Sequence, residues 1–147
     1  MVLGNIGVLK ALSVEPGSVF RMELFPTDGV VPKDDNDDSR YKYFIIIGKN
    51  AAGNYIALTL INTDINPKLQ NIIGPYQHMI FASEYPFLNG RDRYVDCYKI
   101  KEVTTERVIN EAEYIANVSN SLLEEVRKLA ISSPTISQAT IDQYSLT

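Results

Sequence analysis

The sequence predicts a mainly β fold with C-terminal helices: a small antiparallel β-barrel, closed or nearly closed, that one or two helices cover. Two observations carry this prediction. Side chains alternate along Ser18–Phe25, with Phe20, Met22 and Leu24 on one side, which is the period of a half-buried strand. After Val103 the apolar positions recur at helical spacing instead. Short strands separated by turn residues and followed by helices are typical of a barrel with helical cover.

The composition is that of one globular domain. The chain has 147 residues, of which 45% are hydrophobic and 22% are charged, and a chain of this length usually forms one domain. We expect the barrel over about residues 16–103, a helical segment over 104–133 and a C-terminal tail over 134–147. Cys97 is the single cysteine, so no internal disulfide can form, and we predict a reducing, cytoplasmic location.

The other strands follow from local composition. Tyr43–Ile47 is β-branched and aromatic throughout, which predicts a central strand covered on both faces. A turn over Gly48–Gly53 leads into Tyr55–Ile61, its hairpin partner. Gln77–Ala82 and Tyr94–Val103 are two further predicted strands.

Two helices are predicted after the barrel. The first begins at Thr104–Glu106. The second begins at Ser121, because Glu124 three residues later completes a capping box. Its apolar stripe has helical spacing and comprises Leu122, Leu123, Val126, Leu129 and Ala130. Ser132–Pro134 ends it.

The net charge of −4 and the pI of about 5.0 argue against a general nucleic-acid coat, since phosphate neutralisation needs a basic face. A local basic patch stays compatible with these totals. No stretch approaches the roughly 20 apolar residues of a membrane span, so no membrane partner is predicted.

An acidic segment, residues 34–38, invites a calcium hypothesis. An EF-hand loop needs glycine at its sixth position and glutamate at its twelfth. Counted from Asp34, these positions are Ser39 and Ile45, so the motif fails and an exposed, mobile loop is the prediction. No metal site is predicted.

The sequence holds no glycine-rich phosphate loop, GxSxG or HExxH motif, and no cofactor is predicted. His78 is the only histidine. We interpret it as a strand or surface residue, with a general acid or base as the alternative. Cys97 lies within a predicted strand and has no neighbouring histidine, which favours a buried, inert thiol.

A set of polar residues is predicted to gather at one end of the barrel. Arg40 and Lys42 stand where one strand of the hairpin begins, and Asn62–Asp64 where its partner ends. In a hairpin these two places are adjacent. Arg91 and Arg93 precede the last strand. Such cations, with a hydroxyl and a carboxylate, could bind phosphate and stabilise charge during phosphodiester transfer, whereas chance clustering of loop residues is the alternative.

The order of these elements resembles the PemK/MazF-like family, the toxin halves of type II toxin–antitoxin pairs. The resemblance covers residues 16–130 in short segments. They are Pro16–Phe20, Arg40–Ile47, Leu60–Thr63, Tyr94–Ile100 and Val118–Leu123.

The resemblance implies an SH3-like barrel, a homodimer, an antitoxin protein as partner, and metal-independent cleavage of single-stranded RNA. Lys42 or Arg40 would hold the scissile phosphate, Thr63 would position it or donate to it, and Asp96 and Arg93 would act as base and acid. Apart from this resemblance, the predicted binding residues are Arg40, Asn62, Asp64, Tyr85 and Phe87.

A second function stays open from the residues alone. The same barrel without turnover could be a protein- or nucleic-acid-binding module, for example an accessory protein of a phage or mobile element. Its contact surface would comprise Tyr76, Tyr85, Phe87 and Tyr94.

Overall fold

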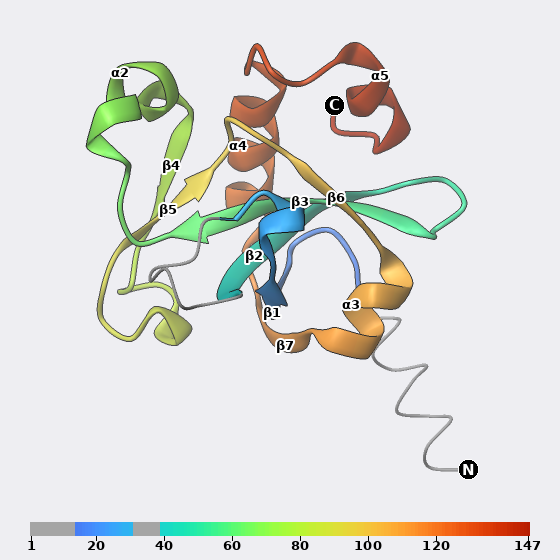
Figure 1. The fold of residues 1–147 in the computed structure, drawn as a ribbon, viewed down its shortest axis with the longest axis horizontal. Helices are drawn as coiled ribbons and strands as arrows, with labels where there is room; N and C mark the ends of the chain where they lie inside the picture. The colour runs from blue at the N-terminus through green and yellow to red at the C-terminus, as the bar shows by residue number, and fades with distance from the viewer. Residues whose placement is uncertain (1–13, 31–38) are drawn as a thin grey trace.

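The centre of the molecule is a seven-stranded antiparallel sheet (Figure 1). The structure, a computed structural model, describes residues 14–30 and 39–147, so the acidic segment predicted to be a mobile loop lies outside the described residues. The strands are β1 (Ser18–Leu24), β2 (Arg40–Lys49), β3 (Tyr55–Asn62), β4 (Gln77–Ile80), β5 (Arg93–Asp96), β6 (Lys101–Thr104) and β7 (Glu113–Asn117).

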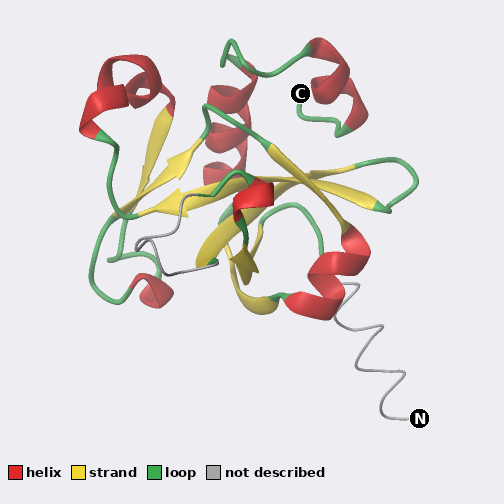
Figure 2. Ribbon diagram, viewed as in Figure 1, coloured by secondary structure: helices red, strands yellow, loops and turns green. Residues whose placement is uncertain are grey.

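Helices surround the sheet (Figure 2). The α-helices are α2 (Gln70–Ile73), α3 (Thr105–Glu111), α4 (Asn120–Ile131) and α5 (Gln138–Gln143). Short 3-10 turns are η1 (Pro26–Asp28), η2 (Pro67–Leu69), η3 (Gly74–Tyr76) and η4 (Pro86–Leu88). None of the helices in the described part of the chain combines the length and apolar character that crossing a bilayer requires.

The predicted mainly β fold with C-terminal helices is confirmed, but the sheet is not closed into a barrel. The strand order is β4-β5-β3-β2-β1-β7, with β6 beside β3, so β4 and β7 form the two ends. The strand predicted over Tyr94–Val103 is two strands, because its halves pair with different parts of β3. β5 pairs with Ile61 and Asn62, whereas β6 pairs with the stretch from Tyr55 to Leu58.

Both faces of the central hairpin are buried, as the apolar stretch of β2 predicted. Ile45 and Ile47 face the helices α4 and α5, and Phe44 and Ile46 face α3. Figure 1 shows α4 and α5 on one side of the central strands and α3 on the other. Residues that alternate along one strand therefore enter two different cores.

The N-cap of α4 is Ser119, and the predicted capping box at Ser121 is wrong. The Ser119 hydroxyl accepts a hydrogen bond from the Leu122 amide at 3.1 Å, and Ser121 lies within the first turn. Both serines precede the same apolar stripe, so sequence spacing alone does not separate them. The stripe itself is confirmed, since Leu122, Leu123, Val126 and Ala130 are buried and Leu129 is half-buried against the same core.

The C-terminal third differs from the predicted helical segment and tail. The predicted first helix is α3, which Thr104 caps, but β7 follows it and pairs with β1 at the sheet edge. The predicted tail contains α5, and its residues Tyr144 and Leu146 are buried against the main core. β7 and α5 are both short, and they are stabilised by tertiary contacts rather than by a long stretch of regularly spaced apolar residues.

A half-buried ion pair fastens η1 to α3. Both carboxylate oxygens of Asp28 accept hydrogen bonds from the Arg107 guanidinium, at 2.8 and 2.9 Å. The Phe25 amide also donates to this carboxylate, at 2.8 Å. The hydrogen bonds from Arg107 are the main cause that holds the pKa of Asp28 below its usual range.

Asp28→Asn is expected to lower the free energy of unfolding by about 2 kcal/mol at neutral pH, the usual scale for a hydrogen bond to a charged group. Because the pKa of Asp28 is depressed in the folded state, this stability is present above the ordinary aspartate pKa. It is lost as pH falls through the folded value. Urea unfolding at decreasing pH should therefore bring the variant and the unaltered protein together.

The matched control is Asp64→Asn. Asp64 pairs with Arg91 at 3.1 Å, and both side chains are exposed, so its loss should change stability little. If the loss of unfolding free energy caused by Asp28→Asn stays constant as pH falls and the aspartates become protonated, this role for the ion pair is contradicted.

Candidate functional site

Polar side chains surround one open cavity of about 470 Å³ where β2 begins and β3 ends. The chain segments around it come from β1, β2, β3 and β5. Its lining residues are Arg21, Ser39, Arg40, Tyr41, Lys42, Tyr43, Ile61, Thr63 and Arg93. We call this cavity the cationic pocket.

Strand register explains why distant residues meet here. Tyr43 of β2 pairs with both Arg21 of β1 and Ile61 of β3. Ile61 in turn pairs with Val95 of β5. Arg93 lies two residues before Val95, on the same face of the strand, and so reaches the end of β3 where Thr63 follows.

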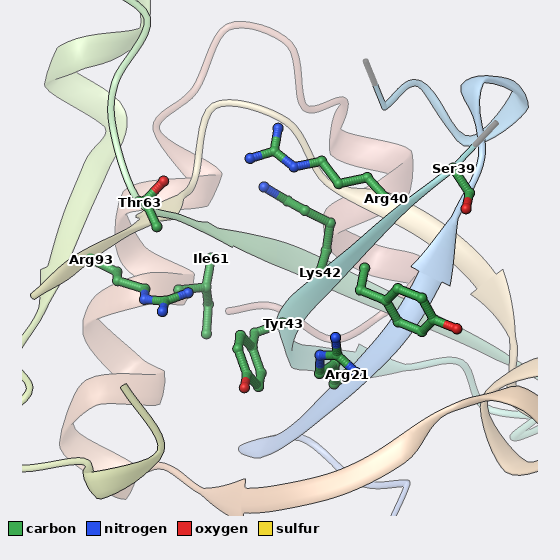
Figure 3. Close-up of a pocket in the computed structure, with 9 residues that line it drawn as sticks. Arg21, Ser39, Arg40, Lys42, Tyr43, Ile61, Thr63 and Arg93 are labelled. Carbon is green, nitrogen blue, oxygen red and sulfur yellow. The ribbon is translucent and has the colours of Figure 1, made fainter. Parts of the chain in front are cut away.

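The pocket is strongly basic. Four of its lining residues are cationic, and none of the described lining residues is acidic: the cations are Arg21, Arg40, Lys42 and Arg93. Figure 3 shows Arg40 and Lys42 extending from β2 in the direction of Thr63, while Arg93 points toward Ile61 and Tyr43. Glu23 lies near the rim, where its carboxylate accepts a hydrogen bond from the Ser39 hydroxyl. Such a field attracts an anion.

Lys42 is held in place by β3. Lys42 is a buried residue, and its ammonium donates a hydrogen bond to the side-chain oxygen of Asn62. A buried cation requires polar partners, because leaving it without them costs several kcal/mol. Asn62, a predicted binding residue, therefore orients Lys42 from behind.

Arg93 has unused hydrogen-bonding capacity. Its Nε is buried and has no hydrogen-bond partner among the described residues. Its guanidinium lies 5.5 Å from the centre of the Tyr43 ring, which packs in turn against Phe87. A buried donor without a partner is uncommon in a native protein.

Five predicted site residues do not line the pocket: Asn62, Asp64, Tyr85, Phe87 and Asp96. Asp96 accepts hydrogen bonds from the Gln77 side chain at 2.9 Å and from the Tyr98 amide at 3.0 Å. Asp64 is in the exposed pair with Arg91.

Tyr85 and Phe87 have structural partners. The Tyr85 hydroxyl accepts from the Ser119 amide at 3.1 Å, and the two rings pack at 6.1 Å. Of the other tyrosines proposed for a contact surface, Tyr76 packs on Tyr98 at 5.5 Å, and both Tyr76 and Tyr94 are half-buried.

His78 and Cys97 lie away from the pocket. His78 is on β4, where its Nε2 is 3.0 Å from the Glu125 carboxylate. Cys97 is fully buried, as predicted, and burial raises the pKa of its thiol to about 12. In residues 14–30 and 39–147, no three His, Cys, Asp or Glu side chains are grouped as metal ligands.

Sequence reasoning missed several residues of the pocket. Arg21, Ser39, Tyr41, Tyr43 and Ile61 line it but were not among the predicted site residues. Arg21 was visible only as one polar residue of an alternating strand. Its place depends on the pairing of β1 with β2, which alternation does not specify.

No protein-family model matches this chain, and no curated protein matches it.

Proposed function

We propose that this protein is a toxin-like, metal-independent endoribonuclease of a type II toxin–antitoxin pair. In this proposal the cationic pocket binds a phosphodiester of single-stranded RNA. The observation that carries it is the gathering of four cations and the Thr63 hydroxyl around one cavity whose described lining is free of carboxylates. Guanidinium and ammonium groups are the usual protein ligands of phosphate.

The reaction that suits such a pocket is transfer of the phosphodiester to the neighbouring ribose hydroxyl. The 2′ oxygen attacks phosphorus and loses its proton, and the bond from phosphorus to the 5′ oxygen breaks. The products are a 2′,3′-cyclic phosphate and a 5′-hydroxyl, which takes up a proton. Negative charge grows on the phosphoryl oxygens in the transition state, where cations fixed beforehand lower the barrier.

The residues divide into distinct roles. Lys42, oriented by Asn62, and Arg40 hold the phosphoryl oxygens, and Thr63 donates a hydrogen bond to one of them. Arg93, which lines the pocket from β5, contributes a further guanidinium to the phosphodiester. Asp96 does not line the pocket, so in this scheme the proton of the 2′-hydroxyl passes to water.

The test is cleavage of a mixed-sequence single-stranded RNA by the purified protein in EDTA. We expect site-selective cuts that leave 2′,3′-cyclic phosphate ends and that are lost in Lys42→Ala and Thr63→Ala. Lys68→Ala is the matched control, because Lys68 is an exposed lysine of η2 outside the pocket. Intact RNA, from protein shown to be folded and free of any bound partner, would contradict the proposed activity.

Binding of RNA without cleavage is the second candidate function. One observation favours it: none of the described residues that line the pocket is a histidine or a carboxylate able to accept the 2′-hydroxyl proton. RNA that binds with a dependence on Lys42 and Arg93 but stays intact would select this function over the first.

The toxin proposal includes an antitoxin protein as partner and a homodimer as the working form. A basic pocket of this kind is complementary to an acidic segment of such a partner, which would block RNA by occupying the same cations.

A further inference from the structure

An exposed aromatic side chain lies at the cationic pocket. Tyr41 of β2 is 55% exposed, whereas Lys42 directly after it is buried and Tyr43 is half-buried. Exposed apolar side chains are ordinary when they stand alone. Tyr41 differs because it lines the same cavity as the four cations.

One face of the Tyr41 ring is covered by a cation. The guanidinium of Arg21 lies over it at 4.4 Å from the ring centre, within the range of a cation–π contact. Arg21 belongs to β1, which pairs with β2 at this level, so the support comes from the sheet. A ring that is already held loses little conformational freedom when a ligand packs on it.

We propose that Tyr41, supported by Arg21, is a stacking platform for an unpaired nucleobase next to the phosphodiester in the cationic pocket. The inference rests on the proposed function, because it names a base-binding position of the same site. Bases of a single strand can turn out to stack on aromatic rings, and every base offers a flat face. Tyr41 is thus a substrate-binding residue that selects single-stranded over duplex substrate.

The experiment measures binding of a non-cleavable 2′-O-methyl single-stranded oligonucleotide in EDTA. We expect Tyr41→Ala to weaken binding roughly 5- to 150-fold, the range that corresponds to loss of one base–aromatic stack. Tyr41→Phe keeps the ring and should bind like the unaltered protein. Tyr55→Ala is the matched control, because Tyr55 is an exposed tyrosine of β3, 42% accessible, that does not line the pocket.

A series of oligonucleotides that each lack one base identifies the stack. For the oligonucleotide that lacks the stacked base, Tyr41→Ala should cause no further loss of affinity, because the ring then has no partner. A duplex of the same sequence should bind equally to the unaltered protein and to Tyr41→Ala. If Tyr41→Ala loses the same affinity for every oligonucleotide that lacks one base, the stacking role is overturned.

The test separates failure of this inference from failure of the proposed function. If Arg93→Ala loses binding while Tyr41→Ala binds like Tyr55→Ala, the stacking platform is overturned and phosphate binding stands. If neither Arg93→Ala nor Tyr41→Ala changes affinity, RNA does not use the pocket, and both proposals are overturned.

Discussion

Replacing Arg93 by alanine is expected to lower the rate of RNA cleavage roughly 100- to 1,000-fold, the cost of removing one preorganised donor from a transition state. The fold should persist. The Arg93 Nε has no hydrogen-bond partner among the described residues. Its removal therefore breaks no hydrogen bond of this atom within the described part of the protein. The measurement is single-turnover cleavage in EDTA, with thermal unfolding as a check of folding.

Arg91→Ala is the control for this prediction. Arg91 stands two positions earlier in the chain, is exposed, pairs with Asp64 and does not line the pocket. Its removal changes the net charge by the same amount, so a general electrostatic effect would slow both variants alike. Equal loss in Arg91→Ala and Arg93→Ala would contradict the assignment of Arg93 to the pocket.

Replacing Gly48 by valine is expected to destabilise the protein by about 3 kcal/mol, at the upper end for overpacking a core. A Cβ atom at Gly48 would lie 2.7 Å from the Tyr144 carbonyl oxygen and 2.9 Å from Leu146 Cδ2. Strand propensity alone predicts the opposite, because valine is favoured in strands. The C-terminal residues must therefore move away from β2 and expose Tyr144, which is now 1% accessible.

Urea unfolding measures this loss, and Gly74→Ala is its control. A Cβ at Gly74 would meet only the flexible side chain of Gln70, and the backbone there is helical. We therefore expect Gly74→Ala to change stability by less than about 1 kcal/mol. If Gly48→Val unfolds at the same urea concentration as the unaltered protein, the packing of the C-terminal segment on Gly48 is wrong.

The central hairpin could be predicted because its signal is local. The apolar stretch within β2 and the turn residues after it specify a buried strand and its partner without help from the rest of the chain. The division between β5 and β6 could not, because it depends on which part of β3 each half pairs with. β7 could not be predicted either, because it forms by pairing with the edge of β1. The burial of Tyr144 depends on the absence of a side chain at Gly48.

The candidate site divides in the same way. Arg40, Lys42 and Thr63 flank the hairpin, so local pairing alone places them together. Arg93 was predicted near them, and β5 brings it to the pocket through its pairing with β3. Asp96 was assigned as a base by resemblance, but side chains alternate along a strand, so it leaves the face that Arg93 shares with Val95.

Arg21 and Tyr41 could not be found from the sequence. Their contact depends on the register of β1 against β2, and the segment between these strands is polar and gives no pairing signal. The sequence predicted polar residues at this end of the strands, but it did not predict that Arg21 stacks on the exposed ring of Tyr41.

The most direct test of the cationic pocket as the RNA site is amide NMR of the uniformly ¹⁵N-labelled protein during titration with a 2′-O-methyl single-stranded oligonucleotide. We expect the largest chemical-shift changes on Lys42, Thr63 and Arg93, and we expect the changes on Lys42 and Thr63 to shrink in Arg93→Ala. Changes confined to the paired tyrosines Tyr76 and Tyr98, with Lys42, Thr63 and Arg93 unmoved, would contradict this expectation.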